Sequence, residues 1–387
     1  MTNLGHANTD RWADYLLKFG EQHQKFWSEY LNTGKKDLLI VMGHGFDPRM
    51  CVGIKSLLTP GGQGKRDVLA IEFHRMVPAS SMGENTESSE FQCSQKQKNL
   101  AELDDLIKDR GTKVIKPVQL YSSEGRIIGS RKAANVFTDF DDIKDYSDII
   151  VDISALPRYI YFPLIGKLLH VLDQQSQKSQ KKTPNLFVVV AENAEIDRNV
   201  QDVEIEETAN YMYGFAGDLE SEATANIPKV WIPILGENQI RQLERIYTLV
   251  NPEEICPIIP SPSVYPRRGD ELIIEYREFL FDRLIVEPKN IIYAAEQNPF
   301  EVYRQIVLTF RHYNEVLSPL GGCKIAISAL SSKLMSLGAL LAVYELKNSG
   351  NSIGIANVET REYGFKEAKR VQDSILFTLW ISGECYD

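Results

Sequence analysis

One sequence pattern occurs twice in this chain of 387 residues. The first copy is IIVDISALPRYIYFPLIGKLL, which begins at residue 149, and the second is KIAISALSSKLMSLGALLAVYEL, which begins at residue 324. Each copy runs from an apolar segment, through a serine-containing turn with one cation, into an amphipathic helix. The backbone N–H groups at the start of such a helix can face an anionic ligand. The repeat predicts two related α/β halves whose loops face one ligand.

The rest of the chain alternates strand and helix patterns in the same way, and its length exceeds one ordinary core. Continuous apolar strands indicate parallel sheets with helices on both faces. We therefore expect two Rossmann-like, doubly wound α/β domains related by duplication, preceded by a helical N-terminal arm. The expected boundaries are an arm at 1–35, a first domain at 36–200, an acidic connection at 201–227 and a second domain at 228–387.

The composition argues against several classes of protein. The formal net charge is −10, whereas a broad nucleic-acid-binding face needs clustered cations. The five cysteines form no CxxC pair, so we expect no metal site and no disulfide framework, and a reducing cytoplasm is the simplest location. No apolar run reaches the roughly 18 residues of a membrane span, and the first residues lack the pattern of a signal peptide. We expect no membrane partner.

The first candidate wall of a ligand pocket follows the apolar segment at 37–42. It reads Gly43-His44-Gly45-Phe46-Asp47-Pro48-Arg49. The two glycines permit close approach of the backbone to a ligand, and ligands of open α/β sheets bind at the carboxyl ends of strands. We expect His44, Asp47 and Arg49 to line the pocket together with Gly43 and Gly45. The alternative is a tight turn held by an ion pair between Asp47 and Arg49.

The second wall comes from the repeated pattern itself. Asp152, Ser154 and Arg158 follow the apolar segment of the first copy, and Arg158 can bind a phosphate through two N–H donors at once. The alternative is that Ser154 caps the next helix and Arg158 is simply exposed. The second copy contributes a set of hydroxyls and one cation, namely Ser328, Ser331, Ser332 and Lys333.

The spacing D-x-S-x-x-x-R at Asp152, Ser154 and Arg158 resembles the loop signature of CRISPR-associated Rossmann-fold (CARF) sensor domains. The second copy is similar to the threonine- and glycine-rich variant of that loop, which also ends in Lys before a helix. It departs from the signature because Ile327 replaces the acidic or amide residue and because its hydroxyl residues are shifted by one. Two such halves in one chain resemble the SAVED arrangement. The resemblance implies binding of a cyclic oligonucleotide second messenger.

Two further loops of the second half carry polar side chains. Asn298 either hydrogen-bonds the edge of a base or caps the helix that follows it. The stretch Tyr265-Pro266-Arg267-Arg268 either stacks on a base and holds a phosphate or is a solvated loop.

No enzyme class has a clear signature in this chain. His44, Asp47 and Ser154 could act as base, orienter and nucleophile, but no nucleophile elbow, Walker loop or metal-ligand spacing supports them. The segment from residue 141 to 169 also resembles nucleoside deoxyribosyltransferase-like and TIR-like domains, in which a helix carries a catalytic glutamate. The corresponding stretch here, Phe162 to Ile165, has no glutamate. We assign no catalytic residue and favour a protein that is not an enzyme.

These observations favour a cytoplasmic nucleotide sensor of a bacterial antiphage defence system. A cyclic oligonucleotide or another phosphorylated nucleotide would bind between the halves through Arg49, Arg158 and Lys333, and a separate effector or complex subunit would carry the output. The alternatives are a nucleotide-processing enzyme (an N-glycosidase, an NAD hydrolase or a messenger-degrading enzyme) and a non-catalytic scaffold subunit of a defence complex. In the scaffold, the aromatic N-terminal arm around Trp12 would dock to a partner.

Overall fold

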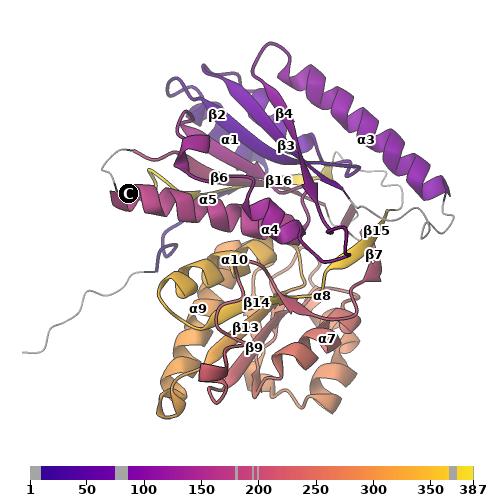
Figure 1. Cartoon of the computed structure of the whole chain (residues 1–387), viewed down its shortest axis with the longest axis vertical. Coiled ribbons are helices and arrows are strands. Elements are labelled where there is room, and N and C mark those ends of the chain that lie inside the picture. Colours follow the sequence, from indigo (N-terminus) through magenta and orange to yellow (C-terminus); the bar gives the residue numbers. More distant parts are fainter. Residues whose placement is uncertain are drawn as a thin grey trace, which may run out of the picture.

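The computed structural model of this chain describes residues 10–74, 86–178, 182–193, 196–197, 200–365 and 373–386. Two α/β halves lie one above the other along the longest axis of the molecule (Figure 1). We call the half that contains β2 (Leu38–His44) the first half and the half that contains β9 (Lys229–Ile234) the second half.

The first half is built on five parallel strands in the order β4-β3-β2-β5-β6. Their bounds are β2 (Leu38–His44), β3 (Arg66–His74), β4 (Lys113–Gln119), β5 (Asp148–Asp152) and β6 (Asn185–Glu192). The helices of this half are α2 (Val52–Leu58), α3 (Thr86–Ile107), α4 (Gly129–Ala134) and α5 (Arg158–Lys178). All residues of β2 and β5 are buried, as expected for central parallel strands with both faces covered.

The second half repeats this plan. Its parallel strands are β9 (Lys229–Ile234), β10 (Glu254–Ile255) with β11 (Ile258–Pro260), β12 (Ile292–Ala294), β13 (Lys324–Ala329) and β14 (Ile353–Asn357), in the order β12-β11-β9-β13-β14. Its main helices are α7 (Ile240–Val250), α8 (Arg268–Glu275), α9 (Pro299–Val316) and α10 (Lys333–Asn348). The short antiparallel strand β8 (Asn210–Tyr211) pairs with β14 at the edge of the sheet.

The two sheets share one topology. Counted along the chain, with β10 and β11 taken together, the five parallel strands of each half lie in the order 3-2-1-4-5, which is the order of Rossmann folds. The fold prediction of two Rossmann-like, doubly wound halves is therefore confirmed. In each half the first and fourth strands are neighbours, β2 beside β5 and β9 beside β13. The strand order reverses there, so these are the two switch points at which a ligand is expected.

The connections between the halves differ from the expected boundaries. The segment at 201–227 was expected to be a plain acidic connection, but it contains most of β7 (Val200–Ile205) and all of β8. Strand β7 leaves the first half and pairs antiparallel with β15 (Thr360–Phe365), which leads back from the second half. The return segment ends in β16 (Ile375–Ser382), which pairs antiparallel with β6. The C-terminal strand thus completes the first sheet and not the second, as Figure 1 shows in yellow.

The N-terminal arm is only partly helical. Residues 1–9 lie outside the described residues, and the arm then contributes β1 (Leu16–Phe19), which pairs with β16, and α1 (Glu21–Tyr30). Trp12 is buried, and Arg11 donates two hydrogen bonds to Asp173 on α5 while its backbone N–H reaches Glu345 on α10. The arm therefore contacts helices of both halves, and Trp12 is part of the core rather than of a docking surface.

A continuous hydrophobic core joins the halves. One cluster of buried side chains extends from Val41 and Ile149 in the first sheet, through Ile165 on α5 and Leu340 on α10, to Ile232 in the second sheet. Tyr344 on α10 also donates a hydrogen bond to Asp173 on α5 over 2.7 Å. Because interfaces of this apolar, continuous kind resist relative motion of the units they join, we expect the halves to move little against each other.

Candidate functional site

A cavity of about 1110 Å³ opens between the two switch points. We call it the cleft. Four loops line it, and each follows the carboxyl end of a switch-point strand: residues 45–49 after β2, 155–158 after β5, 236–239 after β9, and 330–334 after β13. Because the loops of both halves converge on one space, the cleft is the best candidate for a ligand site.

The cleft brings together about half of the residues that the sequence predicted. The predicted residues that line it are Gly45, Asp47, Arg49, Arg158, Ser331, Ser332 and Lys333. The predicted residues that do not line it are Gly43, His44, Asp152, Ser154, Asn298 and Ser328. Each residue of the second group has a structural role or lies elsewhere.

Gly43 allows the two switch-point loops of the first half to touch. A Cβ atom on Gly43 would lie 2.6 Å from the carbonyl oxygen of Ala155, so only glycine fits. His44 is buried next to Glu72 on β3, with 3.6 Å between its Nδ1 and Oε1 of that carboxylate. Gly43 and His44 therefore pack beneath the loop and do not face the cleft.

Asp152 and Ser154 are turned into the protein. The hydroxyl of Ser154 accepts a hydrogen bond from the backbone N–H of Ala191 over 2.8 Å, and its own backbone N–H donates to Asp152 over 2.9 Å. Burial raises the pKa of Asp152 to about 6. The prediction that this pair contacts a ligand is therefore wrong, because both side chains fasten the β5 loop to the sheet.

Asn298 and Ser328 are also structural. Asn298 caps α9, since its Oδ1 accepts from the backbone N–H of Phe300 over 3.1 Å and its Nδ2 donates to the Tyr15 hydroxyl. The capping alternative is thus confirmed. The Ser328 hydroxyl is buried and accepts a 2.6 Å hydrogen bond from the indole N–H of Trp231.

Arg49 lines the cleft, but its guanidinium is already engaged in ion pairs. It donates to both carboxylate oxygens of Asp47 and, over 2.7 Å, to Asp197. Burial by itself would raise the pKa of Asp47, but the charge and hydrogen bonds of Arg49 outweigh burial and hold that pKa below its ordinary value. The ion-pair alternative for this loop is confirmed, and a phosphate would have to displace two carboxylates to reach Arg49.

Lys333 ties the second half to the first. Its Nζ donates to the carbonyl oxygen of Ile153 over 2.8 Å and to that of Ser154. Burial, followed by the positive charge of Arg49, lowers the pKa of Lys333 to about 8. Next to it, Ser332 caps α10 by accepting from the backbone N–H of Met335.

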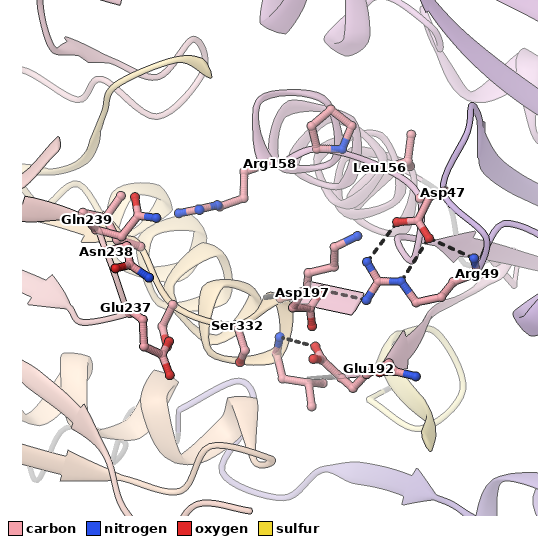
Figure 2. A pocket seen from close by; sticks show the side chains of 18 of the residues that line it. Asp47, Arg49, Leu156, Arg158, Glu192, Asp197, Glu237, Asn238, Gln239 and Ser332 are labelled. Carbon is pink, nitrogen blue, oxygen red and sulfur yellow. Dashed lines mark hydrogen bonds and ion pairs between the residues drawn. The ribbon is translucent and has the colours of Figure 1, made fainter. Parts of the chain in front are cut away.

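Arg158 has a different environment. It is the first residue of α5, and its buried Nη1 atom has no hydrogen-bond partner among the residues that the structure describes. Figure 2 shows its side chain pointing across the cleft toward Gln239 and Asn238, away from the ion pair of Asp47 and Arg49. A buried guanidinium donor without an acceptor is costly, so the site gains from an acceptor that a ligand would supply.

The wall of the second half holds a second ion-pair cluster. Arg268 donates to both carboxylate oxygens of Glu237 over 2.7 Å each and is also paired with Glu296. Of the two alternatives for the stretch 265–268, a phosphate contact through Arg268 would have to compete with these two glutamates, and the solvated-loop alternative does not describe an arginine held in two ion pairs. Asn238 and Gln239 stand beside this cluster and line the cleft with uncharged amides.

Sequence reasoning missed Glu192. It ends β6, lines the cleft, and accepts a 3.3 Å hydrogen bond from the backbone N–H of Leu334 in the second half. Burial, with a smaller contribution from the negative charge of Asp197, raises the pKa of Glu192 to about 7. Its position directly after the apolar run LFVVVA was the available signal, because that run predicts the carboxyl end of a buried strand.

The raised pKa of Glu192 predicts a pH dependence of stability. Since the folded protein holds this proton more tightly than a free glutamate of pKa 4.5, stability falls as the pH rises from 4.5 to about 7. Glu192→Gln removes this loss and keeps an acceptor for Leu334. We expect the unfolding free energy of the variant, relative to wild type, to rise across that window in urea titrations. An equal difference at pH 5 and at pH 8 would contradict the assignment.

Within the described ranges, no group of three or more His, Cys, Asp or Glu side chains is arranged to hold a metal ion. None of the helices in those ranges is long and apolar enough to cross a membrane.

Comparisons with known proteins add little. No family model and no curated protein matches the chain. A universal stress protein from Archaeoglobus fulgidus is 7% identical with a TM-score of 0.23, over 84% of this chain and 97% of its own. An uncharacterised protein from Mycobacterium paratuberculosis is also 7% identical, with a TM-score of 0.21 over 89% of this chain and 91% of its own. Both scores are too low to carry an argument.

Proposed function

We propose that this protein is a cytoplasmic sensor that binds a phosphorylated nucleotide in the cleft and signals to a separate partner, as in a bacterial antiphage defence system. One observation supports the proposal most directly. Two switch points of the same topology open into a single cavity of about 1110 Å³, which exceeds the roughly 300–1,000 Å³ typical of small-molecule sites. A cyclic oligonucleotide, as the CARF and SAVED resemblance implies, is a ligand of suitable size and charge.

The buried Arg158 donor supports the choice of an anionic ligand. In the first half, the carboxylates of Asp47 and Asp197 pair with Arg49, and the nearby cation Lys333 balances the second of their two charges. A phosphate can therefore approach Arg158 without facing uncompensated carboxylates from that cluster. The loop signature itself supports the proposal less than expected, because only its cation, and neither Asp152 nor Ser154, lines the cleft.

A signal from this site would be local. The halves share one core, so ligand binding acts through the loops at the mouth of the cleft rather than by opening the molecule. A separate effector subunit would then recognise the altered loop surface.

The test is a thermal-shift panel of cyclic and linear nucleotides. A ligand at one hundred times its Kd adds about 2.7 kcal/mol to the unfolding free energy, so a true ligand raises the melting temperature measurably. Ser331→Trp fills the cleft from the β13 loop and should abolish the rise. Ser318→Trp, at an exposed position outside the cleft, should keep it. The proposal fails if no nucleotide raises the melting temperature or if Ser331→Trp responds like wild type.

Glu192 favours a second candidate, a nucleotide-processing enzyme. A carboxylate with a pKa near 7 that lines a cleft suits general acid–base chemistry. Chromatography of nucleotides after incubation with the protein separates the two functions. If wild type converts a nucleotide and Glu192→Gln does not, the protein is an enzyme. If the nucleotides stay intact and still raise the melting temperature, the sensor function is supported.

A further inference from the structure

Arg158 and Lys333 occupy equivalent positions in the two halves. Each is the first residue of the helix that follows the fourth parallel strand of its sheet, α5 after β5 and α10 after β13. The surrounding loops are built alike. A Cβ on Gly43 would lie 2.6 Å from the carbonyl oxygen of Ala155, and a Cβ on Gly236 would lie 2.2 Å from that of Leu330. Ala155 and Leu330 each stand three residues before the cation, so this close contact lies at equivalent places in the two loops.

The two equivalent cations differ in their hydrogen-bond partners. Lys333 has two of its three N–H donors on the carbonyl oxygens of Ile153 and Ser154, and it lies close to Asp47 and Glu192. Arg158 has a buried Nη1 with no partner among the described residues and points into the space between the loops. One copy of the motif therefore holds the halves together, and the other copy is left with a donor for a ligand.

The walls that face each other across the cleft also differ in charge. On the side of the second half, Glu237 and Glu296 pair with all three nitrogens of Arg268 and place carboxylates at that wall. The side chains next to them, Asn238 and Gln239, are neutral amides that donate and accept hydrogen bonds. Two arginines on α7 also line the cleft, but Arg245 donates to the carbonyl oxygen of Glu206 and Arg241 is solvent-exposed. The 237–239 loop, which carries one paired carboxylate and two amides, therefore suits an uncharged polar group better than a phosphate.

We infer that the cleft binds its ligand in one orientation, with a single phosphoryl group anchored on Arg158 and an uncharged, hydrogen-bonding base or sugar against the 237–239 loop. This inference rests on the proposed function and narrows its ligand class. A twofold-symmetric ligand would present equal phosphates to both halves, but among the described residues only the first half offers the cleft a buried guanidinium donor without a partner. The cleft-lining Arg241 of the second half is exposed to solvent, where a contact to phosphate is worth less. The ligand is therefore a nucleotide with one dominant anionic anchor.

The test is calorimetric titration with three probes: a nucleoside 5′-monophosphate, the matching nucleoside, and inorganic phosphate. Arg158→Met should weaken the monophosphate about tenfold or more, the usual size for loss of a charge-assisted hydrogen bond to phosphate. It should leave the nucleoside within about twofold, because the wall of the second half is intact. Arg241→Met should change the monophosphate less than about threefold, as expected for an exposed cation. Arg304→Met, on the exposed face of α9 outside the cleft, is the matched control.

The outcomes separate this inference from the proposed function. If wild type binds the monophosphate but Arg158→Met binds it equally well, or if Arg241→Met costs as much as Arg158→Met, the one-anchor inference is wrong while a nucleotide site remains. If a cyclic dinucleotide with two identical phosphates binds and loses equal affinity on Arg158→Met and Arg241→Met, the inference is again wrong. If inorganic phosphate binds through Arg158 but no nucleotide or nucleoside binds, the proposed function fails and the anion anchor stands.

Discussion

Arg49→Met should lower the free energy of unfolding by about 3 to 5 kcal/mol, the usual cost of removing one partner from a buried ion pair. Arg49 is only 2% exposed and forms ion pairs with both Asp47 and Asp197. Methionine fills much of the same volume but removes the guanidinium from the largely buried carboxylate of Asp47, which keeps only the backbone N–H of residue 49 as a neutral donor from this position. Urea denaturation followed by near-ultraviolet circular dichroism measures the loss.

The pH dependence of this loss identifies its cause. In wild type the lowered pKa of Asp47 contributes stability above the ordinary value of 3.8, and this contribution is lost as the pH falls through the lower, folded-state pKa. In the variant that contribution is absent, so the difference between the two proteins should shrink in acid. Arg126→Met is the control, because its ion pair with Glu124 is exposed and its loss should cost about 0.5 kcal/mol or less. A cost for Arg49→Met as small as the control's would contradict the argument.

Trp12→Ala should be comparably damaging, with a loss of about 3 to 5 kcal/mol. The indole is 1% exposed, its N–H donates to the carbonyl oxygen of Ile381 on β16 over 3.0 Å, and its edge packs on Tyr303 of α9 at 5.4 Å. Truncation leaves a large cavity and an unpaired carbonyl between the halves. Trp12→Phe keeps most of the ring packing, so it should recover more than half of the lost stability.

The form of the unfolding curve tests the role of the arm as well. Because Trp12 contacts both halves and the core is continuous, we expect one cooperative transition that moves to lower urea concentration in Trp12→Ala. Tyr293→Ala removes a half-exposed aromatic from the second sheet and should have a much smaller effect. Two separate transitions in wild type, with only one of them shifted by the mutation, would show that the arm does not join the halves.

Much of the fold could be predicted from local pattern. The apolar runs that became β2, β5, β9 and β13 are continuous, and each is followed by a turn and a helical period, which is the local signature of a parallel α/β sheet. The pairing of β16 with β6 could not be predicted, because the sequence of a single apolar strand does not indicate which sheet it joins.

The candidate site was only half predictable for a related reason. The sequence places a residue at the end of a strand, but a side chain there can turn toward the cleft, as Arg158 does, or back into the sheet, as Ser154 does. That choice depends on partners far along the chain. Ser154 meets the N–H of Ala191, and Arg49 meets Asp197, about 150 residues away.

The amino-acid sequence by itself determined the alternation of strands and helices, the duplicated plan and the two equivalent cations, because these depend on residue spacing along a few turns of chain. Only the tertiary structure decided which cation holds the halves together and which one faces the cleft. The reason is physical. Lys333 and Arg158 occupy the same place in the sequence pattern, but the carbonyl groups of residues 153 and 154 lie within hydrogen-bond distance of Lys333 and leave the Nη1 of Arg158 without an acceptor.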